Sequence, residues 1–124
     1  MKNLLSFLLT LLFSSGASAE WVPYISNSVS GDIWFYDTKK IKKRGDIVYV
    51  WTRTKYGERT EFGDGSAEVY YQINCAEYSY TFLRSTYYTD KNWTNQSAQE
   101  GEGEKQYIQP NSTYKLLANI VCKE

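Results

Sequence analysis

Two cysteines, Cys75 and Cys122, constrain the fold of this 124-residue chain more than any other feature. Residues 1–19 have the pattern of a secretory signal, and export brings paired thiols into a compartment where disulfides form and persist. We therefore expect one disulfide that joins positions 47 residues apart, and reject the alternative of two free buried thiols. Such a bridge adds about 4 kcal/mol to the free energy of unfolding in the chain-entropy model.

The first nineteen residues contain the three parts of an export signal. Lys2 supplies a positive charge, residues 4–13 form a short apolar segment, and Ala17-Ser18-Ala19 matches an A-x-A cleavage site. The apolar segment is roughly half the length of about 20 residues that a membrane-spanning helix needs, which disfavours an uncleaved anchor. With no cysteine near the predicted cleavage site, a lipoprotein anchor is unsupported as well. This short, bacterial-type leader predicts a soluble mature chain from Glu20, without a membrane span, in the periplasm or at the surface of a Gram-negative bacterium.

Composition limits the mature chain to one small domain, residues 20–124, and excludes several chemistries. Removing nineteen of the 124 residues leaves 105, the length of a single domain. Without Lys2, thirteen basic residues face fourteen acidic ones, so a net charge of about −1 predicts no general attraction to nucleic acid or membranes. The chain has no histidine, which removes Ser–His and Cys–His nucleophile pairs and the commonest zinc ligand. We expect no enzyme, no metal and no cofactor.

Aromatic and β-branched residues are concentrated in segments with strand patterns, and twelve tyrosines suit the half-buried surface of a sheet. The predicted strands are residues 21–26, 33–37, 47–56, 67–75 and 78–90, the last long enough to twist or bulge. Residues 38–46 are predicted to form a tight connection and a turn, and residues 57–66 a hairpin loop. Residues 91–105 lack apolar periodicity and contain Gly101-Glu102-Gly103-Glu104, which predicts a mobile surface loop.

The C-terminal residues have the pattern of a helix. Asn111 or Ser112 can cap it, because either side-chain oxygen can accept a hydrogen bond from a free backbone N–H. An apolar stripe follows, made of Leu116, Leu117, Ile120 and Val121. Cys122 ends this helix and Cys75 ends a strand. The predicted fold class is therefore α+β: an antiparallel sheet of about five to six strands, with the C-terminal helix packed on one face and tethered by the disulfide.

Two clusters are candidate binding surfaces. The first holds five cations in six positions: Lys39, Lys40, Lys42, Lys43 and Arg44. It can contact sulfated glycans, acidic lipid headgroups or an acidic protein, and the alternative is a solvated turn that Ile41 anchors to the core.

The second cluster is aromatic and borders the predicted loop. It contains Tyr87, Tyr88 and Trp93, residue types that are enriched at protein interfaces, and the alternative is packing on the sheet surface. The acidic residues of the loop, Glu100, Glu102 and Glu104, are interpreted as solvated rather than as a carboxylate pair for catalysis.

The mature chain also resembles the bacterial surface-adhesin protein E family. The resemblance depends on the order of short elements, none diagnostic alone, over nearly all of residues 21–123. They are Trp21-Val22, Tyr36-Asp37-Thr38, Ile41-Lys42, Arg44-Gly45-Asp46, Val48-Tyr49-Val50-Trp51, Tyr71 to Cys75, Ser85 to Tyr88, Ile108 to Ser112 and Val121-Cys122-Lys123.

This resemblance implies an antiparallel sheet whose C-terminal helix is tethered by the Cys75–Cys122 bridge. It further implies binding to host extracellular-matrix or serum proteins, and a homodimer. We therefore expect an exported, non-enzymatic binding protein that acts through its sheet face and loops. The alternative is a periplasmic or envelope accessory protein that binds a small ligand or another envelope protein.

Overall fold

The computed structural model of the protein describes residues 18–123. Residues 1–17, which include most of the predicted export signal, lie outside the described residues, and the signal stays a prediction.

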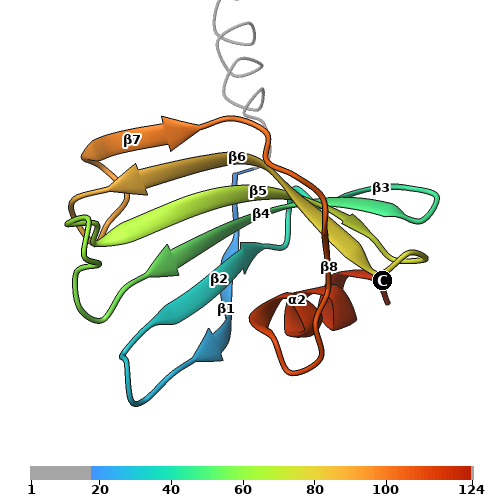
Figure 1. Cartoon of the computed structure of the whole chain (residues 1–124), viewed down its shortest axis with the longest axis horizontal. Helices are drawn as coiled ribbons and strands as arrows, with labels where there is room; N and C mark the ends of the chain where they lie inside the picture. Colours follow the sequence, from blue (N-terminus) through green and yellow to red (C-terminus); the bar gives the residue numbers. More distant parts are fainter. Residues whose placement is uncertain (1–17, 124) are drawn as a thin grey trace, which may run out of the picture.

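Eight antiparallel strands form one twisted sheet (Figure 1). The strands are β1 (Trp21–Ser26), β2 (Ile33–Asp37), β3 (Lys42–Arg44), β4 (Ile47–Lys55), β5 (Ser66–Asn74), β6 (Ser79–Tyr88), β7 (Gln96–Glu100) and β8 (Gln106–Tyr107). The main path is β1-β2-β4-β5-β6-β7, while β3 pairs with β4 and β8 pairs with β6. The expected sheet is confirmed as this six-strand path, with two short strands added to it.

Two of these strands lie where the sequence predicts loops or turns. β3 forms a hairpin with β4, in which Arg44 is paired with Ile47 across a two-residue turn that begins at Gly45 (φ +61°). β7 lies inside the predicted surface loop and pairs with residues 85–88 of β6. All residues of both strands are exposed, so neither has an apolar alternation; each is a strand because a longer neighbour supplies its hydrogen bonds.

One helix, α2 (Thr113–Val121), covers part of one face of the sheet, toward the right in Figure 1. The Ser112 hydroxyl caps it by accepting a hydrogen bond from the Lys115 N–H at 3.3 Å. Cys122 ends the helix and is bonded to Cys75, with their Cα atoms 5.8 Å apart. The α+β fold and its disulfide are therefore confirmed.

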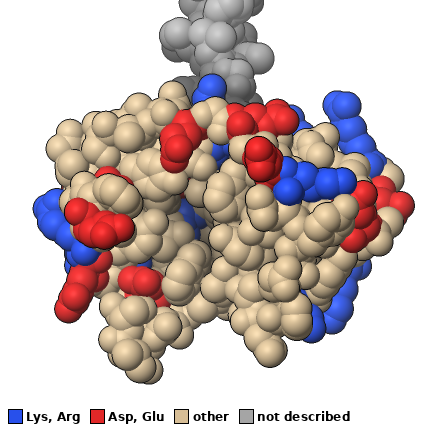
Figure 2. Space-filling view, viewed as in Figure 1, with Lys and Arg blue, Asp and Glu red and all other residues tan. Residues whose placement is uncertain are grey.

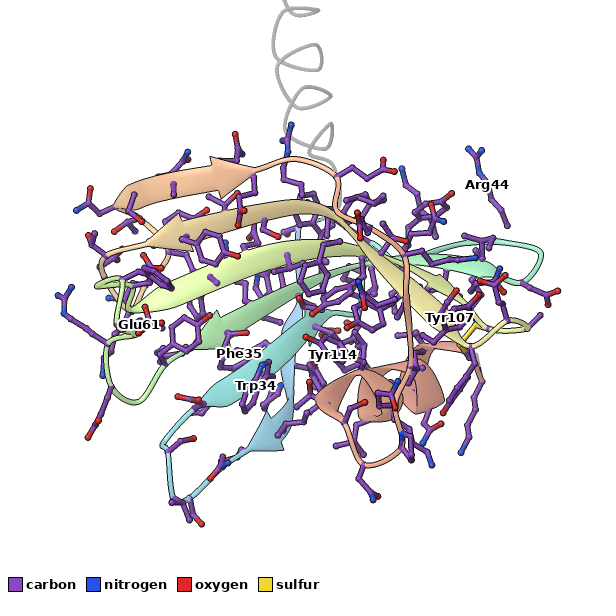
Figure 3. The ribbon with its side chains drawn as sticks, in the orientation of Figure 1. Trp34, Phe35, Arg44, Glu61, Tyr107 and Tyr114 are labelled. Atoms are coloured by element: carbon purple, nitrogen blue, oxygen red, sulfur yellow. A yellow bond between two sulfur atoms is a disulfide. The ribbon has the colours of Figure 1, made fainter. Side chains whose placement is uncertain are left out.

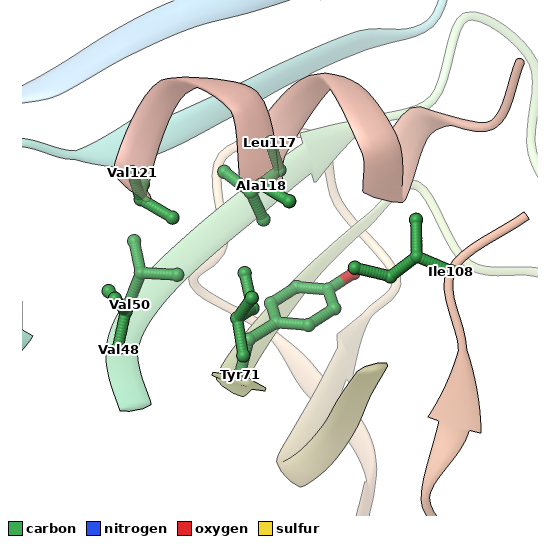
Figure 4. Close-up of a cluster of buried hydrophobic side chains, with 8 residues drawn as sticks. Val48, Val50, Tyr71, Ile108, Leu117, Ala118 and Val121 are labelled. Atoms are coloured by element: carbon green, nitrogen blue, oxygen red, sulfur yellow. The ribbon is translucent and has the colours of Figure 1, made fainter. Parts of the chain in front are cut away.

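The hydrophobic core lies between α2 and the strands beneath it (Figure 4). Its buried members are Val48, Val50, Tyr71, Ile73, Ile108, Leu117, Ala118 and Val121. The predicted helix stripe needs one correction, because Leu116 is 49% exposed. Residues advance by about 100° around a helix, so a face centred on Leu117 and Val121 also contains Ala118 and turns Leu116 toward solvent.

The end of the sheet far from α2 is held by close contacts between loops. A Cβ atom at Gly57 would lie 2.1 Å from the Ser30 carbonyl oxygen, so only glycine fits where these turns meet. The Asp32 carboxylate accepts a hydrogen bond from the Gly57 N–H at 2.8 Å. A Cβ at Gly65 would lie 2.9 Å from the Asp90 carbonyl oxygen. These contacts fix the β4–β5 loop, residues 56–65, against its neighbours.

Candidate functional site

The sheet face opposite α2 carries a continuous row of aromatic side chains, which we call the aromatic face. Its members are Trp21, Phe35, Tyr49, Trp51, Tyr70 and Trp93, with Arg53 among them. The rings of Trp51 and Tyr70 stack with centroids 4.4 Å apart and an interplanar angle of 24°. Tyr49 continues the stack at 6.2 Å from Tyr70. These rings are half-buried, because they cover the backbone and each other without a helix above them.

Arg53 organises the other half of the aromatic face. Its guanidinium carbon lies 4.4 Å from the ring centroid of Trp21 and 4.8 Å from that of Trp93. Its Nε donates a hydrogen bond to Glu68 Oε2 at 2.8 Å. Trp93 is fixed further by its own Nε1, which donates to the Ala67 carbonyl oxygen at 3.0 Å. Cation–π contacts and a hydrogen-bonded ion pair therefore hold these side chains in one arrangement.

The three aromatic residues singled out from the sequence do not form one surface. Trp93 belongs to the aromatic face. Tyr88 is paired with Ser66 on that side, and burial with the nearby Glu68 carboxylate raises its pKa. Tyr87 is paired with Ala67 and points to the opposite side, the side of α2. The alternation of β6 separates the neighbours, so only Tyr88 and Trp93 contribute to the same side.

The last three residues of the basic run, β3 (Lys42–Arg44), form a hairpin with β4 at one end of the aromatic face, where Figure 3 labels Arg44; Lys39 and Lys40 lie in the turn before it. All five cations, Lys39, Lys40, Lys42, Lys43 and Arg44, are exposed, and Ile41 packs against the core as expected. Lys42 is paired with Tyr49, so its side chain belongs to the side of the aromatic face, whereas Lys43 belongs to the other side. Two of the cations, Lys42 and Arg44, therefore extend the aromatic face.

A bulge in β6 brings a further cation to the aromatic face. Tyr70 is paired with Arg84 and Tyr71 with Phe82, so Leu83 is the extra residue. Leu83, Arg84, Trp51, Tyr70 and Glu102 line a shallow depression of about 390 Å³. Glu102, one of the acidic loop residues, thus faces the aromatic row.

A larger pocket of about 600 Å³ opens on the α2 side of the sheet, at the end far from the helix. We call it the acidic pocket; it is lined by Tyr56, Thr60, Glu61, Phe62, Asp64, Tyr87, Ser97, Ala98 and Glu100. Asp64 is only 9% exposed, and its Oδ1 accepts a hydrogen bond from the Ser97 hydroxyl at 3.0 Å. Burial, followed by the neighbouring Tyr87 and Asp64, raises the pKa of Tyr56 to about 12.

Of these lining residues, the sequence predicts Tyr87 as a candidate contact residue and interprets Glu100 as a solvated loop residue. The available signal was Phe62 inside the polar β4–β5 loop, where it is 84% exposed. Glu104, the third acidic loop residue, is exposed and lines neither depression.

Within residues 18–123, no group of three or more His, Cys, Asp or Glu side chains is arranged to hold a metal ion. None of the helices described there has the length and apolar character needed to cross a membrane.

Comparisons with known proteins place this geometry in a family. The structure resembles crystal form II of Haemophilus influenzae protein E, with a TM-score of 0.63 and 16% identity over 87% of this chain and 91% of that one. The selenomethionine form of the same protein gives a TM-score of 0.63 and 17% identity over 87% and 89% of the two chains. No curated protein sequence matches significantly. The family model for surface-adhesin protein E matches residues 21–123, and the chain therefore belongs to that family.

Proposed function

We propose that this protein is an exported, non-enzymatic adhesin that binds host extracellular-matrix or serum proteins through the aromatic face and the adjoining basic hairpin. The observation that carries the proposal is the aromatic face itself, a surface of half-buried rings on the side of the sheet that α2 leaves open. Family membership supports the same role.

The residue types of this face are those that dominate protein interfaces. Trp, Tyr and Arg are enriched among the residues whose truncation costs the most binding energy. Trp51 and Tyr70 are already stacked, and Trp93 is hydrogen-bonded, so a partner would immobilise few additional side chains. A pre-arranged surface of this kind supports binding without a large conformational change.

The cations at the aromatic face indicate that the partner's surface is acidic. Lys42, Arg44 and Arg84 lie at or beside the stacked rings, and none of them forms an ion pair within residues 18–123. Glu102 is the acidic exception at the edge of this region. An acidic surface on the partner is complementary, and raised salt should slow association because exposed charges are screened.

Binding of the purified mature domain to a panel of immobilised matrix and serum proteins, at low and raised salt, tests the proposal. We expect Trp51→Ala to abolish most binding, and the double variant Lys42→Gln/Arg44→Gln to weaken it about tenfold at low salt. Lys115→Gln/Lys123→Gln, which removes two cations elsewhere, is the matched control and should bind normally. Unchanged binding by Trp51→Ala, with its fold intact by circular dichroism, would exclude the aromatic face.

Surface labelling of intact cells distinguishes this function from the alternative of a periplasmic accessory protein. An adhesin should be labelled on intact cells. Protection until the outer membrane is permeabilised would reject the adhesin and leave the envelope role, for which a ligand-sized pocket is the supporting observation.

A further inference from the structure

We propose that the acidic pocket binds an organic cation, that is, an ammonium or guanidinium group carried on an apolar stem. The proposal is independent of the adhesive role, because the pocket lies on the α2 side of the sheet and shares none of its lining residues with the aromatic face.

Asp64 lines the pocket with a largely buried carboxylate. The β4–β5 loop folds around this residue, because the Thr60 hydroxyl accepts from its N–H at 3.1 Å and its carbonyl oxygen accepts from the Thr60 N–H at 3.0 Å. The Ser97 hydroxyl donates to Oδ1, and no described residue donates to Oδ2. Every fully buried side-chain oxygen or nitrogen in residues 18–123 has a partner, so Oδ2, which has none, keeps some exposed surface, and Asp64 lines the pocket.

A carboxylate that is nine-tenths buried needs charge compensation. Removing a charged group from water is costly unless it is paired. Here one oxygen accepts from a neutral hydroxyl and the other has no partner among the described residues, so a cation in the pocket that Asp64 lines would complete the set of partners.

The surrounding charges point to the same ligand. Glu61 and Glu100 line the pocket beside Asp64, and no lysine or arginine lines it. Arg59 and Lys91 donate to the carbonyl oxygens of Gly63 and Gly57, and neither forms an ion pair with a pocket carboxylate. The two ion pairs among residues 18–123, Arg53–Glu68 and Lys105–Glu77, involve none of the pocket carboxylates. In Figure 2 several acidic side chains lie around the left-hand end of the molecule, beside a basic group at its edge, and Figure 3 labels Glu61 at this end.

The aromatic residues that line the acidic pocket indicate the apolar part of the ligand. Tyr56, Phe62 and Tyr87 line the space, and aromatic rings attract cations through their faces and apolar stems through burial. Phe62 is 84% exposed, so a ligand would remove a large apolar surface from water. A volume of about 600 Å³ is within the usual range for small-molecule sites. Carboxylates with aromatic walls select a cation over a neutral or anionic ligand of the same shape.

An NMR titration of the mature, disulfide-bonded domain tests this inference. The probes are phenethylamine, its neutral analogue 2-phenylethanol, and N-acetyl-arginine methylamide. We expect saturable shifts at Tyr56, Asp64 and Tyr87 with the two cations, and about tenfold weaker binding of the alcohol. Tighter binding of the amine points to a free small molecule, and tighter binding of the blocked arginine to a side chain of a protein partner. Equal affinity for the alcohol, or shifts confined to other residues, would overturn the proposal.

Substitutions of Asp64 and Glu100 test whether the pocket carboxylates are responsible for cation binding. Asp64→Asn keeps an acceptor for Ser97 and should weaken cation binding about tenfold. Glu100→Gln lies on the exposed edge strand, where the fold is at little risk, and should weaken it about threefold. Glu104→Gln, outside the pocket, is the control and should change nothing. Wild-type affinity in a folded Glu100→Gln and a folded Asp64→Asn would exclude an electrostatic site.

Discussion

Adjacent residues of β4 enter two different environments. Val48 and Val50 point toward α2 and are 2% and 0% exposed, whereas Tyr49 and Trp51 point to the aromatic face and remain half-buried. On the first face a helix excludes water. On the second the side chains cover one another by stacking and by cation–π contacts, so they remain accessible to a partner.

The face under α2 therefore mainly stabilises the fold, whereas the aromatic face remains available for binding. Apolar burial under α2 contributes free energy of folding and leaves little surface for recognition. The aromatic face contributes less to folding, because its rings keep part of their surface in water. We therefore expect mutations on the two faces to have effects of different size and kind.

The largest effect should come from removing the disulfide. Cys75→Ser/Cys122→Ser releases a constraint over 47 residues and should lower the free energy of unfolding by about 4 kcal/mol. Urea unfolding measures this change. Hydrogen exchange should show the loss of protection mainly in α2, while the Trp93 indole N–H on the opposite face stays protected. An unchanged unfolding midpoint would show that the bridge does not stabilise the fold.

The next effect compares two adjacent leucines of α2. Leu117→Ala leaves a cavity under the helix and should cost about 3 kcal/mol, since Leu117 is 1% exposed. Leu116→Ala removes the same atoms from a side chain that is 49% exposed, and should change stability by less than about 0.5 kcal/mol. Similar losses for both variants would contradict the observed orientation of the helix.

A third substitution, with a smaller expected effect than Leu117→Ala, tests the contacts of the aromatic face. Arg53→Ala removes contacts with Trp21, Trp93 and Glu68 and should cost about 1 kcal/mol, partly suppressed by raised salt. Arg84→Ala, on the same side but without an ion pair among residues 18–123, is the control and should unfold like the wild type. If Arg53→Ala cost as much as Leu117→Ala, the aromatic face would be a second core rather than a binding surface.

Much of the fold could be predicted because it depends on local signals. Alternating residues mark β4 and β5, and Ser112 caps the helix because its hydroxyl side chain can satisfy a free N–H there. β7 could not be predicted in this way, since its polar residues form a strand only beside β6.

The candidate sites likewise depend partly on local sequence and partly on contacts between distant residues. The sequence by itself determined the cysteine pair, the basic run of residues 39–44 and the aromatic content, since each depends on residue identity or close spacing. Only the tertiary structure decided that Tyr87 lies on the α2 side and Tyr88 on the side of the aromatic face, and that Ser97 meets Asp64 across 33 positions to form a pocket. The physical reason is that strand register and loop packing, which involve distant residues, determine where each side chain points.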